Sequence, residues 1–193
     1  MIRIVAILGS VRPGNYTAKA LALVENEVAK HADIAWEVVD PAKMHLAFPG
    51  AGGDQGEVRK LRETVASATG VIFATPEYHG SFSSVTKLVI ENLGYPSVLA
   101  GKPVTLLGVA EGQIGAIKSL EALSRVCAHV GAIVLPGPVS VAQVQRMFDA
   151  EGRCTDAGVE KRIRSVATNL IDYIKGSICP PGGAGGHGRG GSG

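Results

Sequence analysis

The sequence predicts an α/β fold with a doubly wound, five-stranded parallel sheet, and three observations lead to this prediction. Short apolar runs rich in β-branched residues alternate with longer segments whose apolar residues recur at helical spacing. Each strand-length run precedes a helix-length segment, which is the pattern of successive βα units and of a parallel sheet covered on both faces. Right-handed crossovers leave few topologies for five such units, and we expect the strand order 2-1-3-4-5.

The five expected strands are short and end at turn-forming residues. The third is apolar throughout its centre, Val71-Ile72-Phe73-Ala74, so we expect it to be buried on both faces. The fifth runs into Pro136-Gly137-Pro138, which suits a sheet edge because proline cannot donate a ladder hydrogen bond. The expected strands are Arg3–Gly9, Ile34–Asp40, Gly70–Thr75, Pro103–Ala110 and Ala132–Leu135.

The segments between these strands have the periodicity of amphipathic helices. The second segment is the clearest, because Val58, Leu61, Val65 and Ala68 fall on one side of a helix. Asp156 can cap a last helix, whose apolar residues keep the helical period as far as Ile174. The other expected helices are Thr17–His31, Ser83–Leu93 and Gly115–Val130.

The length and composition indicate one domain, residues 1–176, followed by a tail. The chain has 193 residues, and its last stretch, 177–193, is rich in glycine and has no apolar run. We expect this tail to be disordered, because it cannot bury enough surface to offset its ordering entropy. Charged residues make up 19% of the chain, below the usual ~25%, which indicates that a partner subunit covers part of the surface.

Several classes of function are excluded by charge and by cysteine usage. A net charge of +2 is too weak to argue for nucleic acid or an anionic membrane, and no run approaches the ~20 apolar residues that span a bilayer. Cys127, Cys154 and Cys179 are widely spaced and fit neither a disulfide framework nor a zinc site. The apolar N-terminus lacks a cleavage pattern and is expected to be a strand. We therefore expect a reduced, cytoplasmic protein without a metal, with Cys127 packed in the core.

A ligand of such a sheet is expected at the switch point, beyond the carboxyl ends of the first, third and fourth strands. The loop after the first strand opens a helix, whose free N–H groups favour an anion. Its Gly9 and Gly14 allow the backbone to approach a ligand closely. Ser10, Asn15 and Thr17 offer hydroxyl or amide donors, and Arg12 adds a cation. No lysine reaches toward β/γ phosphates, so a monophosphate fits better than a nucleoside triphosphate. The alternative is that Asn15 or Thr17 only caps the helix and that Arg12 is a solvated charge.

The loop after the third strand suits a flat, aromatic ligand. Pro76 fixes the turn, Gly80 lets the backbone approach a ring, and Tyr78 can lie against one. Ser83 or Ser84 is expected to act instead as the N-cap of the following helix.

His79 has no second metal ligand at a suitable spacing and no orienting acid. We expect it to border the ligand or a substrate and not to act as a catalytic base. In the loop after the fourth strand, Ala110–Gly115, two glycines around a polar pair suit a backbone wall for a planar ligand edge. Its glycines, Gly112 and Gly115, also suit a purely structural turn.

These residues resemble the flavodoxin-like NAD(P)H-dependent FMN reductases, a family that includes quinone, chromate and azo-dye reductases. The resemblance covers roughly Arg3 to Lys175 and depends on two motifs. They are Gly9-Ser10-x-Arg12-x-x-Asn15-x-Thr17 and Thr75-Pro76-Glu77-Tyr78-His79-Gly80-Ser81, followed by Lys87. The resemblance implies FMN and either NADPH or NADH as cofactors, a small-molecule electron acceptor, and a homodimer or homotetramer with active sites at subunit boundaries.

The resemblance also implies which residues hold the cofactor: the first loop the FMN phosphate, the others the isoalloxazine ring. The implied residues are Ser10, Arg12, Asn15, Tyr16 and Thr17, then Pro76, Glu77, Tyr78, His79, Gly80 and Ser81, then Glu111 and Gly112. Two departures from the family pattern stand out. His79 replaces a frequent Asn, which bears on the pocket over the flavin. Leu88 replaces the Asn of a Lys-Asn pair, and Leu93-Gly94 lacks the usual aromatic, which bear on subunit packing.

The expected activity is a ping-pong reduction, in which electrons pass from NAD(P)H to bound FMN and, once the oxidised nicotinamide has left, to the acceptor. We expect no catalytic side chain, because the cofactor carries this chemistry and the protein positions it. One alternative is a non-enzymatic electron carrier of the flavodoxin type, although such proteins are acidic and this chain is slightly basic. Another is a flavin-free regulatory module such as a phospho-receiver, which needs acidic residues where this chain has Gly9 and Thr75. Whether FMN is retained or diffuses as a substrate is left open.

Overall fold

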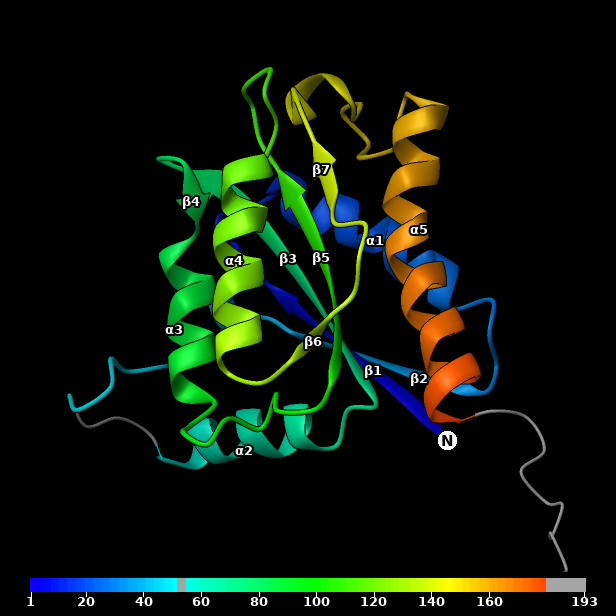
Figure 1. Cartoon of the computed structure of the whole chain (residues 1–193). Coiled ribbons are helices and arrows are strands. Elements are labelled where there is room, and N and C mark those ends of the chain that lie inside the picture. Colours follow the sequence, from blue (N-terminus) through cyan, green and yellow to red (C-terminus); the bar gives the residue numbers. More distant parts are fainter. Residues whose placement is uncertain (52–54, 180–193) are drawn as a thin grey trace, which may run out of the picture.

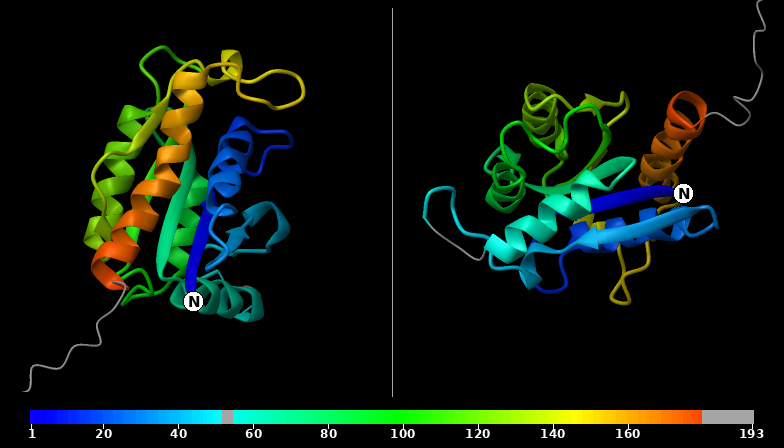
Figure 2. Two further views of the ribbon diagram at one scale, coloured as in Figure 1. Left: turned by 90° about the vertical axis from the view of Figure 1, so that its right-hand side faces the viewer. Right: turned by 90° about the horizontal axis from the view of Figure 1, so that it is seen from below.

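The computed structural model describes residues 1–51 and 55–179, and its central layer is a parallel sheet between two layers of helices (Figures 1 and 2). The strand order is β2-β1-β3-β5-β6, with a two-residue strand β4, Ser81–Phe82, antiparallel to β3. Among the parallel strands β5 is the fourth and β6 the fifth, so the predicted order 2-1-3-4-5 is confirmed. The main strands are β1 Ile2–Leu8, β2 Ile34–Val39, β3 Gly70–Tyr78, β5 Pro103–Val109 and β6 Ile133–Val134.

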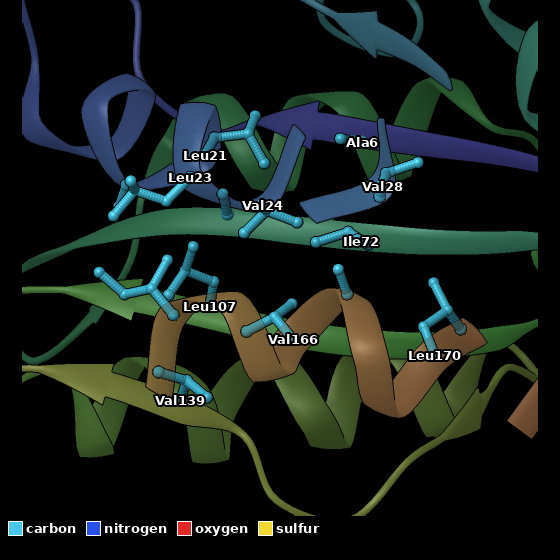
Figure 3. Close-up of a cluster of buried hydrophobic side chains, with 14 of the residues drawn as sticks. Ala6, Leu21, Leu23, Val24, Val28, Ile72, Leu107, Val139, Val166 and Leu170 are labelled. Carbon is cyan, nitrogen blue, oxygen red and sulfur yellow. The ribbon is translucent and has the colours of Figure 1, made fainter. Parts of the chain in front are cut away.

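Two apolar cores lie on opposite faces of the sheet, as the expected helices require. α1 (Tyr16–Val28) and α5 (Ala157–Tyr173) pack on one face, where their leucines and valines meet Ile72 and Leu107 (Figure 3). The helices α2 Gln55–Ala66, α3 Ser84–Asn92 and α4 Ile117–His129 pack on the other. β3 contributes Ile72 to one core and Phe73 to the other, which confirms its burial on both faces.

The helix starts follow the capping residues in the sequence. Ser83 begins α3 by accepting a hydrogen bond from the Thr86 amide, and Asp156 begins α5 in the same way through Val159. Cys127 lies on α4 in the second core, as predicted, and burial raises the pKa of its thiol to about 12.

The fifth strand differs from the prediction, because it continues beyond its prolines. After β6 the chain passes through Pro136-Gly137-Pro138 and forms a further strand, β7 (Val139–Val141), which also pairs in parallel with β5. The break follows from the two prolines, which have no N–H for the ladder, and from Gly137, whose φ is 82°. The segment β7 carries the chain back to the upper end of β5 in Figure 1.

The end of α5 also differs from the expected domain boundary. A π-helical turn, Ile174–Ile178, extends the helix through Ser177, which the sequence had assigned to the tail. The rest of the predicted tail, 180–193, lies outside the described residues. No helix within residues 1–51 and 55–179 is long and apolar enough to cross a membrane.

Candidate functional site

The loops after β1, β3 and β5 meet at the carboxyl ends of these strands, around one pocket of about 690 Å³. The sequence predicted this meeting, and all of the predicted site residues except Gly80 and Ser81 line the pocket. Further lining residues not among those predicted are Pro13, Gly14, Val109, Ala110, Gln113, Ile114, Gly115 and Val144.

The loop after β1 is shaped by Asn15. Its Oδ1 accepts a hydrogen bond from the Ala18 amide at 2.8 Å, which caps α1, and its Nδ2 donates to the Arg12 carbonyl at 2.7 Å. Asn15 therefore caps α1, and it also lines the pocket. Because both polar ends of its side chain are occupied within the loop, Asn15 sets the loop conformation and presents the first turn of α1 to the pocket.

Ser10 has the feature that most clearly marks a ligand site. It is only 3% exposed, it lines the pocket, and its Oγ is buried with no hydrogen-bond partner among the described residues. A buried hydroxyl without a partner costs about 1–3 kcal/mol. Together with the N-terminus of α1 and the Arg12 guanidinium, this hydroxyl fits an anionic group that accepts hydrogen bonds.

Arg12 of the first loop and Tyr78 at the end of β3 are in contact along one wall of the pocket. The Arg12 guanidinium carbon lies 4.9 Å from the centre of the Tyr78 ring, in a cation–π contact. Arg12 is exposed, as expected for a solvated charge, but its guanidinium is held over an aromatic face. The pocket thus has a cation and an aromatic ring on the same wall.

His79 and Gly80 form a tight turn between β3 and β4. Tyr78 pairs with Ser81 and Glu77 with Phe82, so the two residues between them close a two-residue hairpin. Both have a positive φ, 52° at His79 and 74° at Gly80, as a type I′ turn requires. Gly80 and Ser81 therefore build the hairpin and are not brought to the pocket, whereas His79 lines it.

Glu77 faces the start of α4 as well as the pocket. Its Oε2 accepts a hydrogen bond from the Ser119 amide at 3.2 Å, and the N-cap residue Ala116 makes no side-chain capping bond. A second remote residue, Ser140, accepts the Ala116 amide at 2.8 Å through its Oγ. The free amides at the start of α4 are thus bound by side chains of β3 and β7 and not by the helix's own N-cap residue.

The loop after β5 is fastened to the segment that follows β7. The Val144 amide donates to the Ala110 carbonyl at 3.0 Å, and the Gln143 amide donates to the Gly112 carbonyl at 3.1 Å. The same segment brings Val144 into the pocket wall. The sequence analysis missed Val144 because it did not include the loop after the fifth strand, which ends at the same rim of the sheet.

Gly9 has a different role from the one expected. A Cβ at this position would lie against the Thr86 hydroxyl and 2.7 Å from the Ala74 carbonyl oxygen, so the glycine is required by packing between β1, β3 and α3. The sequence had suggested close approach to a ligand. Gly14, with a φ of 64°, has no atom near its missing Cβ and serves the turn before α1.

No group of three or more side chains suited to a metal occurs within residues 1–51 and 55–179. A doubly wound sheet whose switch-point pocket is lined by a helix N-terminus, a cation and an aromatic ring is typical of nucleotide-binding proteins. Comparison with known families identifies which family of this class the chain belongs to. The model of the NADPH-dependent FMN reductase family matches residues 2–146, and the chain belongs to that family. It is therefore an oxidoreductase that uses FMN and NAD(P)H.

Similar proteins agree with this assignment over nearly the whole chain. The chain is 29% identical to an NAD(P)H-dependent FMN reductase of Pseudomonas aeruginosa, over 90% of this chain and 96% of the relative. It is 27% identical to a 2-hydroxy-1,4-benzoquinone reductase of a Burkholderia species, over 90% of this chain and 97% of the relative. The fold resembles FerB of Paracoccus denitrificans, a flavoenzyme NAD(P)H:(acceptor) oxidoreductase, with a TM-score of 0.74, 20% identity, and coverage of 91% and 98%.

Proposed function

We propose that the pocket formed by the three loops is the FMN site of this reductase. The observation that carries the proposal is the buried, unpartnered hydroxyl of Ser10 beside Arg12 and the start of α1. These groups suit the phosphate, because a helix N-terminus and a guanidinium both favour an anion. Thr17, buried on the first turn of α1 and lining the same pocket, belongs to this end of the site.

The other end of the pocket suits the isoalloxazine ring. Tyr78 offers an aromatic face, and Pro76 and His79 extend the same wall from the end of β3. Glu111 and Gly112 face them from the loop after β5. Tyr16 also lines the pocket, and its ring packs against Phe148 with their centres 6.3 Å apart. Glu77, bound to the Ser119 amide, shapes the wall through the start of α4.

The chain's own residues bind and orient, since FMN when bound supplies the capacity to accept and pass on a hydride. The protein can position the cofactor because hydrogen bonds fix each wall of the pocket. Asn15 binds the first loop to α1, Glu77 binds the end of β3 to α4, and the Val144 amide binds the loop after β5 to the segment after β7. Preorganised walls reduce the entropy lost when two flat rings must be brought into contact.

We propose a quinone or another flat, small molecule as the electron acceptor, in a ping-pong sequence with NADPH or NADH. The support is the relative named 2-hydroxy-1,4-benzoquinone reductase, together with the Staphylococcus aureus relatives named FMN-dependent NADPH-azoreductase. A pocket wall that admits a nicotinamide ring also admits a planar acceptor after the first product has left.

The test is a visible absorption spectrum of the purified protein with and without added FMN, followed by titration with NADPH and NADH. We expect a shifted flavin spectrum, and steady consumption of NAD(P)H with a quinone and no other protein. Gel filtration of the FMN-loaded protein shows whether the flavin is retained or diffuses as a substrate. A colourless protein that does not respond to FMN contradicts the proposal, and flavin bound without turnover favours an electron carrier.

We further propose a homodimer or homotetramer formed through the face of α3 and α4. An open groove of about 940 Å³ lies there beside two exposed aromatic side chains, Phe48 at 73% and Tyr95 at 89%. The groove carries both signs of charge, including Lys87, Glu91 and Arg125, so the face can complement itself about a two-fold axis.

Sedimentation over a range of concentrations tests this assembly. We expect Tyr95→Glu to shift the distribution toward the monomer. The control is Val38→Glu, an exposed position on β2 two residues from Trp36, which therefore shares with Trp36 the face of the sheet covered by α1 and α5, opposite to α3 and α4. A wild-type protein that is monomeric at all concentrations contradicts the proposal.

We propose a reducing compartment, the cytoplasm, for this protein. The support is that Cys127, Cys154 and Cys179 are all free thiols in the structure. A thiol titration of protein isolated under non-reducing conditions tests it: three reactive thiols after unfolding are expected.

A further inference from the structure

Three hydroxyl side chains form a buried network at the point where β1, β3 and α3 converge. Thr75 lies in the buried part of β3, Ser83 caps α3, and Thr86 lies in the first turn of α3. Thr75 and Thr86 are 0% exposed and Ser83 is 2% exposed. Buried polar groups are retained where their hydrogen bonds are satisfied, and these three satisfy one another.

Each hydroxyl has one proton to donate, and Ser83 Oγ and Thr86 Oγ1 also lie 3.0 Å apart, where either oxygen can be the donor. Ser83 Oγ donates to the Gly9 carbonyl at 2.6 Å, and Thr86 Oγ1 donates to Thr75 Oγ1 at 3.2 Å. Thr75 Oγ1 in turn donates to the Pro76 carbonyl at 3.0 Å. Thr75 Oγ1 also accepts the Ser83 amide at 3.2 Å, and Ser83 Oγ accepts the Thr86 amide at 3.1 Å.

The two ends of this network are the carbonyl groups of Gly9 and Pro76, which lie next to residues that line the pocket. Gly9 directly precedes Ser10, and its amide donates to the Ala74 carbonyl at 2.7 Å. Pro76 opens the loop that carries Tyr78. The hydroxyls therefore join the start of the loop that holds Ser10 to the residues at the end of β3 that lead to Tyr78. The missing Cβ of Gly9 allows this contact, because a methyl group there would collide with the Thr86 hydroxyl.

We propose that Thr86 is a positioning residue, which fixes the separation between the two ends of the flavin site without lining the pocket. This inference rests on the proposed FMN site. Its consequence is specific to ligands that span both loops. FMN, with a ring and a phosphate, must match both loops at once, whereas riboflavin has the ring but not the phosphate. Loss of the network removes the preorganisation that only FMN uses in full.

The experiment compares Thr86→Val, which removes the hydroxyl at nearly constant shape, with Thr86→Ser, which keeps it. The matched control is Thr105→Val on β5: Thr105 is 5% exposed and its Oγ1 has no hydrogen-bond partner in the described part of the chain. The dissociation constants of FMN and riboflavin are measured by quenching of flavin fluorescence, and the melting temperature is measured without flavin.

We expect Thr86→Val to weaken FMN binding about tenfold, the scale of one buried hydrogen bond, and riboflavin binding less than about twofold. Thr86→Ser restores the wild-type FMN affinity, and Thr105→Val leaves both affinities unchanged. A Thr86→Val protein with a lower melting temperature but with FMN and riboflavin affinities changed by one common factor, or not at all, overturns the inference and leaves Thr86 a purely structural residue.

A second measurement needs no variant. In the wild type, saturating FMN is expected to slow hydrogen exchange at the Gly9 and Ser83 amides, which lie within the network, more than saturating riboflavin does. Equal protection by the two flavins overturns the inference while leaving the flavin site in place. A wild-type protein that binds neither flavin overturns the proposed function, and this inference with it.

Discussion

Arg12 has two roles in the pocket: it is the cation that lines the pocket together with Ser10, and its guanidinium lies over the Tyr78 ring. Arg12→Ala is expected to weaken FMN binding by about 1.5–3 kcal/mol, the usual loss for a hydrogen bond to a charged group. Riboflavin affinity should change less, because the phosphate is missing. Arg162→Ala, an exposed arginine on α5, is the control. Unchanged FMN affinity in Arg12→Ala removes Arg12 from the phosphate site.

His79 has a left-handed backbone conformation, and many members of the family have asparagine at this position. The conformation explains why asparagine is common there. Asparagine tolerates positive φ better than most residues, and β-branched residues tolerate it least. With φ at 52°, His79→Asn is expected to raise the free energy of unfolding by about 0.5 kcal/mol, and His79→Val to lower it by about 1–3 kcal/mol. Urea unfolding measures both. Equal stability of the two variants contradicts the turn assignment.

At the scale of the secondary-structure elements, the first turn of α4 depends on a hydrogen-bond acceptor from β3, the Glu77 carboxylate. Glu77→Ala removes the acceptor of the Ser119 amide, and we expect a loss of about 0.5–2 kcal/mol of stability together with faster exchange at that amide. Glu77→Gln keeps an acceptor oxygen and should recover part of the loss. Glu121→Ala, an exposed acidic residue further along α4, is the control. Normal protection of Ser119 in Glu77→Ala contradicts the capping role.

Elements with a long, regular pattern were predictable from the sequence, and short ones were not. The burial of β3 on both faces and the caps Ser83 and Asp156 follow from local residue types. β4 and β7 could not be predicted, because two or three residues carry no periodicity and their pairing depends on strands far away in the chain. The cap of α4 was missed for the same reason: its partners Glu77 and Ser140 are non-local.

At the scale of the whole molecule, the place of the site was predictable and the roles within it were not. Strand order alone brings three loops to one rim, and the pocket lies there. The packing of Gly9 against Thr86 is visible only once α3 is placed on β1 and β3. The capping role of the Asn15 side chain likewise depends on the fold of its own loop, where it binds the Ala18 amide and the Arg12 carbonyl.

The buried thiol of Cys127 couples the stability of the whole fold to alkaline pH. Burial raises its pKa to about 12, against about 8.5 in an unfolded chain. Between these values the unfolded state loses a proton that the folded state keeps, so the stabilisation is complete below pH ~8.5 and is lost as pH rises toward 12. The expected slope is up to about 1.4 kcal/mol per pH unit.

Urea unfolding in reducing buffer at several values above pH 8 measures this slope. Cys127→Ala is expected to flatten it, while Cys154→Ala and Cys179→Ala, at less buried positions, leave it unchanged. A slope that is the same in all three variants contradicts the assignment to Cys127.

The broken fifth strand has a consequence for how copies of this chain meet. An uninterrupted outer strand is a template on which another polypeptide can add its backbone, and that is a route to fibrils. Here two prolines split the border into β6 and β7, so neither piece presents a long row of unpaired amides. Joining two sheets into one continuous sheet along this border is thereby disfavoured.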